Sequence, residues 1–502
     1  MKGYCCMGVL LLALCSLVLM PGSADGADLY DSPFGEYGYR THGSGSSGDP
    51  YWSEILSFDA SEAYVEVQSA LEGYPMTEIT GGSFGMCRGM TDLVLPKTLE
   101  RVGAGAFADC VTLERIYFLG DRPDIGSDAI PGDVEVYRLQ GTRGWGPEAE
   151  VLPLYIRSGD GGSFSYYVLN GGAAVHALVT GTDIIIPQSV PADGTAVRVT
   201  TIGDEAFRNS KITSVNIPDT VTRIGVRAFY GCHELMTAEL PPSLMTVCDE
   251  AFRECGKLGN VDLHDAVFIG FEAFRMCYSF TDVIIPDSVS VMKCGAFRVC
   301  YSMESLTIGS GITDIPDSAF DYCQSLKNVD IRGKVKSVGK NAFFNAVNFM
   351  PALERISLPD VEIIGDSAFY GCINLTDVVV GGDLREIGPY AFYDCRSLSP
   401  LSLPASLEKV GDMAFCNDRN LSDIYFAGKM PEFGRDVFAG TDTTVHCTEK
   451  NVKSWAGFEG RLAVESDGGP DYAVPAVIIA VLILVAAGAF AVMRSGSKGG
   501  SG

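Results

Sequence analysis

The 502-residue sequence has little positive charge. Lys and Arg number 37 against 63 Asp and Glu, which gives a formal net charge of −26. A nucleic acid is itself a polyanion and would be repelled by such a chain, so the composition argues against nucleic-acid binding. The same excess of carboxylates favours a soluble, exposed surface, but it does not name a partner.

Histidine is also scarce, and cysteine lacks the spacing of metal and redox sites. No Cys-x-x-Cys pair follows the first 24 residues, and no phosphate-binding, dinucleotide-binding or calcium-loop signature is present. The five histidines share no metal-ligand or catalytic-triad spacing: His42, His176, His233, His264 and His446. The sequence therefore predicts no metal site, no cofactor and no catalytic residues.

What the sequence does contain is a recurring Ala-Phe pair, whose Phe we call the plug. A fixed period in the twenties is the signature of a solenoid, in which each coil buries its apolar side only against its neighbours. A short first series with a spacing of 23 is Phe84, Phe107 and Ile130. The main series recurs every 22 or 23 residues, with one interval of 26: Phe207, Phe229, Phe252, Phe274, Phe297, Phe320, Phe343, Phe369, Phe392, Phe415 and Phe438.

Each repeat reads A-F-x-x-C-x-x-L-x-x-I-x-L-P-x-x-L-x-x-I-G. In one copy, Leu398, Leu401 and Leu403 predict a short strand that points alternate side chains inward. The Pro that follows ends the strand because it has no N–H. The Ile-Gly pair predicts a tight corner into the next coil. The plug Phe is expected to fill the middle of each coil.

These A-F-x-x-C, L-x-x-I-x-L-P and I-G elements resemble the BspA-type (Treponema pallidum-type) leucine-rich repeats of microbial surface proteins. The resemblance covers residues 79–150 and 195–463. It implies a secreted or surface-anchored binding protein or adhesin that contacts host matrix proteins or other cells. It implies no catalytic residues. The expected fold is a mainly β leucine-rich-repeat solenoid with one parallel strand per coil of 22–23 residues, in two arrays plus one C-terminal transmembrane helix.

One short motif imitates a hydrolase. Gly81-Gly82-Ser83-Phe84-Gly85 matches the nucleophile-elbow pattern G-x-S-x-G, which requires a strand-to-helix turn with His and an acid nearby. Phe84 is, however, a plug of the first series, and Ser83 stands where the repeat has Ala. We therefore interpret the match as a coil corner, and the chain is not expected to be an enzyme.

Nine cysteines occupy one position of the repeat, three residues after the plug. A residue that recurs once per coil predicts a ladder along one wall of the solenoid. Buried structural thiols that pack as small hydrophobes are the favoured interpretation. Disulfides between neighbouring coils are the alternative, since stacked strands lie about 4.8 Å apart. The ladder comprises Cys87, Cys110, Cys232, Cys255, Cys277, Cys300, Cys323, Cys372 and Cys395.

The two ends of the chain predict export and anchoring. Residues 1–24 have the pattern of a signal peptide, with Lys2 before an apolar run; a signal anchor is the alternative. Residues 473–493 carry no charge and, as a helix, span roughly 31 Å, enough for one bilayer. Arg494 and Lys498 follow, so the repeats are expected outside and residues 494–502 in the cytoplasm. A lipid-anchor signal is the alternative for this tail.

The remaining boundaries follow composition and period. Both arrays end in similar segments that predict caps, each with a Trp (Trp145 and Trp455), because an open end would expose apolar surface. The predicted divisions are a flexible Gly/Ser-rich leader at 25–50, a short first array with its cap at 51–150, a hairpin linker and N-terminal cover of the second array at 151–195, the main array with its cap at 196–463, and a stalk at 464–472.

The candidate binding surface lies on the predicted parallel strands. Residues at offsets two and four of L-x-x-I-x-L point away from the core and are mostly polar and varied. Curved solenoids use such extended faces for recognition; a solvated face without a ligand is the alternative. The candidate residues are Ser214, Asn216, Thr237, Glu239, Asn260, Asp262, Asp282, Ser305, Thr307, Asn328, Asp330, Arg355, Ser357, Asp377, Ser402, Asp423 and Tyr425.

Two functional hypotheses follow. The first is a membrane-anchored cell-surface binding protein or adhesin that recognises an extracellular protein or glycan on another cell or on the matrix. The second is a structural protein of the cell envelope that makes contacts with copies of itself. Signal, solenoid and anchor together favour the first.

Overall fold

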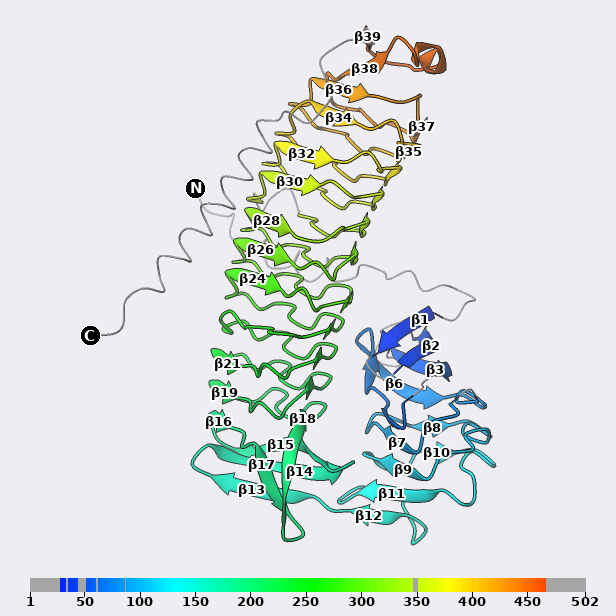
Figure 1. Ribbon diagram of the computed structural model, residues 1–502, viewed down its shortest axis with the longest axis vertical. Coiled ribbons are helices and arrows are strands. Elements are labelled where there is room, and N and C mark those ends of the chain that lie inside the picture. The colour runs from blue at the N-terminus through cyan, green and yellow to red at the C-terminus, as the bar shows by residue number, and fades with distance from the viewer. Residues whose placement is uncertain are drawn as a thin grey trace, which may run out of the picture. The chain divides into compact units, whose positions relative to one another are not determined.

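The structure is a computed structural model that describes residues 28–32, 35–43, 51–59, 62–85, 87–345 and 351–465. It contains two compact units, each with stacked parallel coils (Figure 1). The first unit is Met1–Thr180 with Gln188–Ala206, and the second is Gly181–Pro187 with Phe207–Gly502. The predicted mainly β solenoid with coils of about 23 residues is confirmed.

The predicted signal peptide, transmembrane helix and cytoplasmic tail all lie outside the described residues. Within the described ranges, no helix has the length and hydropathy needed to cross a bilayer.

The first unit stacks its coils between two walls. One wall, which we call the strand wall, contains the strands Asp92–Leu95 and Arg115–Phe118 of the L-x-x-I-x-L pattern, and we call the other the opposite wall. The strand wall has the order β12 (Glu150–Leu152), β11 (Glu135–Leu139), β9 (Arg115–Phe118), β7 (Asp92–Leu95) and β4 (Tyr64–Glu66). The opposite wall has the order β1 (Asp28–Ser32), β2 (Gly35–His42), β3 (Trp52–Asp59), β6 (Tyr74–Ile79), β8 (Arg101–Val102) and β10 (Asp124–Ile125), with β5 (Ala70–Leu71) against β6.

The flexible leader expected at 25–50 is wrong for the part that the structure describes. Strands β1 and β2 form an antiparallel hairpin, and β2 continues the sheet on β3. Tyr39 on β2 is only 3% exposed. The Gly and Ser content of the segment concealed this alternating strand, which covers the edge of β3.

A second sheet covers the strand wall of the first unit. Strands β13 (Tyr155–Gly159), β14 (Gly162–Leu169) and β15 (Gly172–Thr180) are antiparallel neighbours. Parallel β18 (Thr195–Ile202) follows β15, and β17 (Ser189–Ala192) pairs with β18. One apolar cluster joins the strand wall to this sheet and comprises Val94, Tyr117, Leu139, Leu152, Tyr167, Leu169 and Ala174.

The predicted role of 151–195 as linker and cover of the second array stays a prediction. The apolar cluster shows only that Tyr167, Leu169 and Ala174 of β14 and β15 pack on the strand wall of the first array.

The second unit repeats the same two-walled coil. Its strand wall contains four short parallel sheets: β16 (Asp183–Ile185), β19 (Ser214–Asn216), β21 (Thr237–Glu239); β24 (Asp282–Ile285), β26 (Ser305–Ile308), β28 (Asn328–Ile331); β30 (Arg355–Leu358), β32 (Asp377–Val380); and β34 (Leu401–Leu403), β36 (Asp423–Phe426), β38 (Thr444–Thr448), β39 (Leu462–Glu465). A 3-10 helix, η2 (Val452–Trp455), lies between the last two strands.

The opposite wall of the second unit consists of two-residue parallel strands, one per coil, seen edge-on beside the strand wall in Figure 1. In chain order they are β20 (Arg223–Ile224), β22 (Thr246–Val247), β23 (Phe268–Ile269), β25 (Val291–Met292), β27 (Asp314–Ile315), β29 (Ser337–Val338), β31 (Ile363–Ile364), β33 (Glu386–Ile387), β35 (Lys409–Val410) and β37 (Glu432–Phe433).

The plug phenylalanines form one continuous column in the second unit. Neighbouring rings stack nearly parallel, from 4.9 Å between Phe229 and Phe252 to 6.0 Å between Phe297 and Phe320. Each ring offset-stacks on the next, which stabilises the coil beyond the apolar area that it buries. In the first unit Phe58 precedes Phe84 and Phe107, with ring centroids 5.0 Å apart at each step. The column therefore starts one coil earlier than the Ala-Phe pattern predicts.

The cysteine ladder is built of buried thiols, as favoured from the sequence. The ladder cysteines Cys110, Cys232, Cys255, Cys277, Cys300, Cys323, Cys372 and Cys395 are free and buried. Each donates its S–H to the carbonyl of the plug Phe in the preceding coil; Cys255, for example, reaches the Phe229 carbonyl at 3.1 Å. Burial raises the pKa of Cys300 and of Cys372 to about 12.

The corner between coils forms differently from the prediction. Left-handed residues fall two positions before the plug and, in most coils, two positions after it, and most of them are not glycine, such as Tyr390 at φ 58° and Met413 at φ 55°. The glycine of the Ile-Gly pair is needed for close approach instead. A Cβ on Gly411 would lie 2.3 Å from the main-chain nitrogen of Pro389 in the preceding coil. Stacked coils leave no room for a side chain there.

The two segments predicted as caps contain the same contact. Trp145 packs on Phe118 with ring centroids 4.7 Å apart, and its indole N–H points to the Gly120 carbonyl at 3.4 Å. Trp455 packs on Phe426 at 5.0 Å and points to the Gly428 carbonyl at 3.5 Å. Each Trp therefore covers a buried Phe of the strand wall near the end of its array.

Candidate functional site

The strand register of the second unit places the candidate residues in two columns. Asn216 is the register partner of Glu239, and Thr307 is the partner of Asp330. Ten candidates are exposed: Asn216, Thr237, Glu239, Asn260, Asp262, Asp282, Asn328, Asp330, Arg355 and Ser402. Seven are half-buried: Ser214, Ser305, Thr307, Ser357, Asp377, Asp423 and Tyr425. We call these two columns the strand face.

The strand face is interrupted at the coil of Asn260 and Asp262, which forms no strand. There the side-chain carbonyl of Asn260 accepts hydrogen bonds from the main-chain N–H groups of Thr281 and Asp282, at 2.8 and 3.2 Å. The Asn260 amide also donates to the Thr281 hydroxyl at 3.0 Å. Asn260 therefore replaces a main-chain ladder and holds two coils together. The repeat pattern alone does not show this role.

Sequence reasoning missed the first rung of the face. Strand β16 aligns Asp183 with Ser214 and Ile185 with Asn216. Asp183 accepts hydrogen bonds from the hydroxyls of Ser214 and Thr213, both at 2.8 Å, and these hold its pKa below the usual value. No plug precedes β16 at the repeat spacing, so the period gave no signal for it.

The last rungs were missed as well. The two ring nitrogens of His446 contact Asp423 and Glu465, each at 2.7 Å, and the imidazole stacks on Tyr425 at 4.3 Å. Hydrogen bonds from Ser422 and His446 lower the pKa of Asp423. These contacts engage two candidate residues in joining β36, β38 and β39.

The strand face is strongly acidic. Arg355 is the one cation in its two columns, and it already pairs with Asp377 at 2.9 Å. Its carboxylates, including the first rung, are Asp183, Glu239, Asp262, Asp282, Asp330, Asp377 and Asp423. None of these carboxylates is the register partner of another on the strands, but together they give the face an excess of negative charge, which favours a positively charged ligand.

Two isoleucines project from the same face. Ile185 and Ile284 are each 59% exposed, although isoleucine is among the residues most often buried in proteins. Apolar side chains among carboxylates give a surface that buries area as well as matching charge. This composition suits a protein partner better than a purely ionic one.

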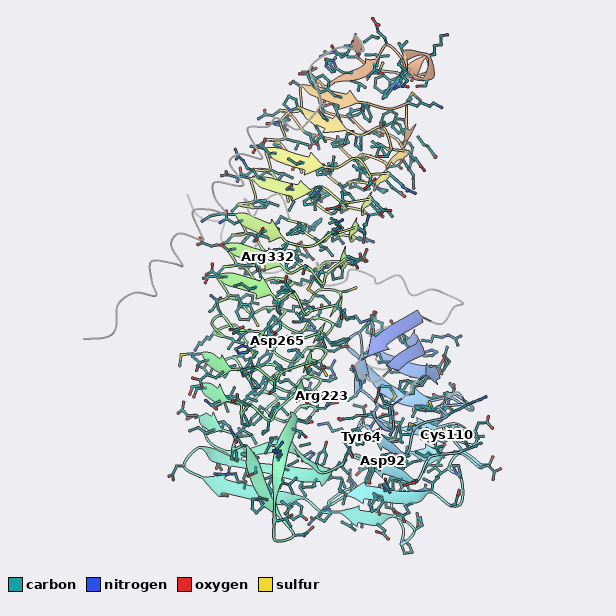
Figure 2. The ribbon with its side chains drawn as sticks, viewed as in Figure 1. Tyr64, Asp92, Cys110, Arg223, Asp265 and Arg332 are labelled. Carbon is teal, nitrogen blue, oxygen red and sulfur yellow. The ribbon has the colours of Figure 1, made fainter. Side chains whose placement is uncertain are left out.

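The first array has no such open face. Its positions equivalent to Asn216 and Glu239 are Val94, 1% exposed, and Tyr117, 9% exposed. Both belong to the cluster under β14 and β15. Tyr64 and Asp92, register partners on β4 and β7, lie on this covered wall (Figure 2). Apolar residues at offset four already signalled the cover.

A set of buried ion pairs, which we call the buried charge ladder, lies within two residues of the plugs of the second unit. Glu272 accepts from Arg253 at 2.7 Å and from Arg275 at 2.9 Å. Arg298 continues the ladder to Asp321 at 2.9 Å, where burial raises the pKa of Asp321 to about 7 against the lowering effect of Arg298. Because these carboxylates are already bound by guanidiniums of neighbouring coils, the ladder holds coils together.

No group of His, Cys, Asp or Glu within the described ranges is arranged to hold a metal ion. Ser83 of the G-x-S-x-G match is buried, and its hydroxyl contacts the carbonyls of Thr80 and Ile55 at 2.7 and 3.0 Å. The corner interpretation agrees with this geometry.

Comparison with known proteins assigns the family. Four spans match the model of the BspA type leucine-rich repeat region in six copies: 71–132, 200–269, 266–351 and 348–456. Together they cover more than half of the chain. The chain belongs to the BspA-type leucine-rich repeat family. Proteins with these repeats are of the surface and binding type, and leucine-rich repeat proteins generally mediate protein–protein binding.

Solved structures share the repeat. A leucine-rich repeat protein from Bacteroides ovatus is 24% identical over 62% of this chain and 100% of its own, with a TM-score of 0.32. The T. pallidum leucine-rich repeat protein is 25% identical over 42% of this chain and 87% of its own, with a TM-score of 0.34. Because these TM-scores are below 0.5, the family assignment rests on the repeats themselves. No curated protein matches the sequence.

Proposed function

We propose that this BspA-type protein is a cell-surface binding protein or adhesin whose second array holds an extracellular protein on its strand face. The observation that carries the proposal is that exposed carboxylates and exposed isoleucines share the strand face. Arg355, the cation among the residues of its two columns, is already paired with Asp377. Charge complementarity favours a basic protein segment over an anionic glycan.

Anchoring is part of the same proposal. The signal peptide at 1–24 would export the chain, and the apolar segment 473–493 would hold it in the membrane with the repeats outside. The stalk at 464–472 spans at most about 30 Å, so the end of the second array would stay near the bilayer.

The homotypic envelope alternative is less favoured by the charge of the face. Two copies that met through their strand faces would juxtapose carboxylates with carboxylates, which costs binding free energy. An adhesin that recognises a basic partner has no such penalty.

The test uses the full chain on the cell surface, a panel of extracellular-matrix and cell-surface proteins, and a double charge reversal. Replacing Glu239 and Asp330 by Lys is expected to weaken binding of the best partner about tenfold, because two exposed carboxylates become cations and Arg332, which pairs with Asp330 at 3.3 Å, is left beside another positive charge. Binding of the unmodified chain is expected to weaken at high salt.

The matched control reverses Glu408 and Glu432, two exposed carboxylates on the opposite wall, which changes the net charge equally. This control is expected to keep full affinity. Equal losses for both double variants, or no binding to any member of the panel, would contradict recognition by the strand face.

A further inference from the structure

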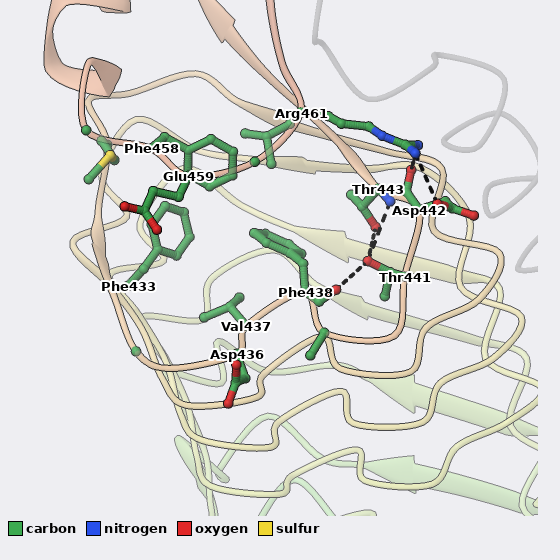
Figure 3. Close-up of a pocket in the computed structure, with 16 residues that line it drawn as sticks. Phe433, Asp436, Val437, Phe438, Thr441, Asp442, Thr443, Phe458, Glu459 and Arg461 are labelled. Atoms are coloured by element: carbon green, nitrogen blue, oxygen red, sulfur yellow. Dashed lines mark hydrogen bonds and ion pairs between the residues drawn. The ribbon is translucent and has the colours of Figure 1, made fainter.

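The column of plug rings ends with an open face at Phe438. Phe415 stacks on Phe438 with centroids 5.9 Å apart and ring planes 8° apart. Phe415 is fully buried, whereas Phe438 is half-buried. Phe433 and Phe458 also contact Phe438, but edge-on, with ring centroids 5.9 and 6.5 Å away (Figure 3). No further ring stacks parallel to Phe438 among the described residues.

The open face belongs to a cavity because the two walls end at different heights. The strand wall continues through β38 and β39, while the opposite wall ends at β37. Trp455 covers the strand side, leaving a cavity of about 670 Å³ over the plug side, lined by Phe433, Val437, Phe438 and Phe458 (Figure 3). This volume is in the range of sites that bind drug-sized groups.

Main-chain donors of the last coil point to the same place. In each coil from the plug Phe229 to the plug Phe415, the N–H groups two before, at and two after the plug donate to carbonyls of the next coil; Phe415 reaches the Val437 carbonyl at 3.0 Å. The equivalent N–H groups of Asp436, Phe438 and Gly440 have no following coil within the described part of the chain. Three aligned donors beside an aromatic cavity are the unfinished edge of a coil stack.

The rim of the cavity is negative. Asp436 and Glu459 are exposed there, and the Arg461 guanidinium is paired with Asp442 at 3.2 Å. The chain itself shows which residue suits the position of Asp436. Two residues before their plugs, Arg227 and Glu250 of neighbouring coils form an ion pair. A basic residue in a next rung would face Asp436 in the same way.

The starts of the arrays are not open to receive this edge. Strand β2 covers β3 in the first array. The Ala206 carbonyl beside the first plug of the second array accepts the Leu178 N–H at 2.9 Å. The carbonyl that the plug N–H of a second copy would need at the start of the second array is therefore already bonded, and a foreign peptide fits better.

We propose that this terminal cavity binds an extended peptide of another protein that continues the coil stack. An aromatic side chain of the peptide stacks on the open face of Phe438. Peptide carbonyls accept hydrogen bonds from Asp436, Phe438 and Gly440, as in the addition of a strand to a sheet edge. A basic residue two positions before the aromatic one pairs with Asp436.

The probe is a fluorescein-labelled synthetic peptide that copies residues 223–231, Arg-Ile-Gly-Val-Arg-Ala-Phe-Tyr-Gly. It carries the Ala-Phe pair with Arg two positions before the Phe. The full chain, purified in detergent, is titrated by fluorescence anisotropy, and saturable binding is expected. The same peptide with Ala in place of its Phe is expected to bind at least about tenfold more weakly, since it lacks the buried ring.

Two protein variants locate the peptide. Asp436→Lys changes an exposed rim residue without touching the core, and it is expected to weaken binding about three- to fivefold through the lost ion pair. The control Glu408→Lys makes the same charge change on the opposite wall and should bind as the unmodified chain does. The double reversal of Glu239 and Asp330 should also leave this peptide bound, which separates the cavity from the strand face.

Several outcomes would overturn the proposal. These are absence of saturable binding, equal affinity for the Phe and Ala peptides, and equal affinity of Asp436→Lys and the unmodified chain. Displacement of the probe by a peptide copying residues 464–472 would instead assign the cavity to the protein's own tail, and the foreign-peptide assignment would fail.

Discussion

The thiol of Cys395 donates a hydrogen bond to the carbonyl of Phe369, one coil earlier, at 3.2 Å. The same carbonyl accepts the main-chain N–H of Cys372 within its own coil, also at 3.2 Å. One acceptor with two lone pairs thus joins a turn to the next coil. Cysteine suits the position because it is small, apolar and still a donor. The contact recurs along the column and links each plug to its successor.

Removing one thiol should loosen its coil. Cys300→Ala deletes the bond to the Phe274 carbonyl at 3.3 Å and leaves a small void at a fully buried position. We expect a loss of about 1–3 kcal/mol in unfolding free energy, measured by chemical denaturation. Cys416→Ala lies outside the ladder, at 8% exposure, and should cost less. An equal loss in both variants would contradict a special role for the ladder.

The ladder thiols should resist alkylation in the native protein. Burial raises the pKa of Cys300 and Cys372 to about 12, so the reactive thiolate is scarce at pH 8. Cys294 is half-buried and should be labelled by iodoacetamide first. Mass spectrometry of labelled peptides measures the order. Equal labelling of Cys300 and Cys294 before unfolding would show that the column opens.

One rung of the ladder carries a carboxyl instead of a thiol. Asp418 lies three residues after Phe415, is fully buried, and accepts the Cys395 N–H at 2.7 Å. Burial raises its pKa well above the usual value. Stability from the protonated form is therefore complete below about pH 4 and is lost as the pH rises through the folded-state pKa.

Asp418→Cys should restore the ladder and remove this pH dependence. We expect its midpoint of thermal unfolding to exceed that of the unmodified chain by about 3 °C or more at pH 8, and by less at pH 4.5. Asp418→Asn removes the charge without adding a thiol and is the matched control. A gain from Asp418→Cys that was the same at both pH values would rule out ionisation as its cause.

Breaking the buried charge ladder should be costly. Glu272 is 4% exposed and binds the guanidiniums of Arg253 and Arg275. Glu272→Gln leaves buried cations without their counter-charge, so we expect a loss of about 3–5 kcal/mol by chemical denaturation. Glu304→Gln removes an exposed pair with Lys327 and should cost less than about 1 kcal/mol. Similar costs would mean that burial adds nothing to the ladder.

Much of the fold could be predicted because its contacts repeat. Phe252, Phe297 and Phe392 lie in one column because each contacts the residue one period away. The same regularity placed the candidate residues in two columns, whose register the strands confirm. What the pattern could not supply was the role of each polar side chain. Asn260 forms a hydrogen bond to the next coil, and Asp423 contacts His446.

Periodic spacing in the sequence determined the coil, the plug column, the thiol ladder and the family, since each depends on contacts between neighbouring repeats. Tertiary structure decided which faces remain open. Strands β14 and β15 cover the wall of the first array, and β37 ends the opposite wall before β39 ends the strand wall. Both outcomes arise from segments that do not repeat, and only their packing in three dimensions shows what they cover.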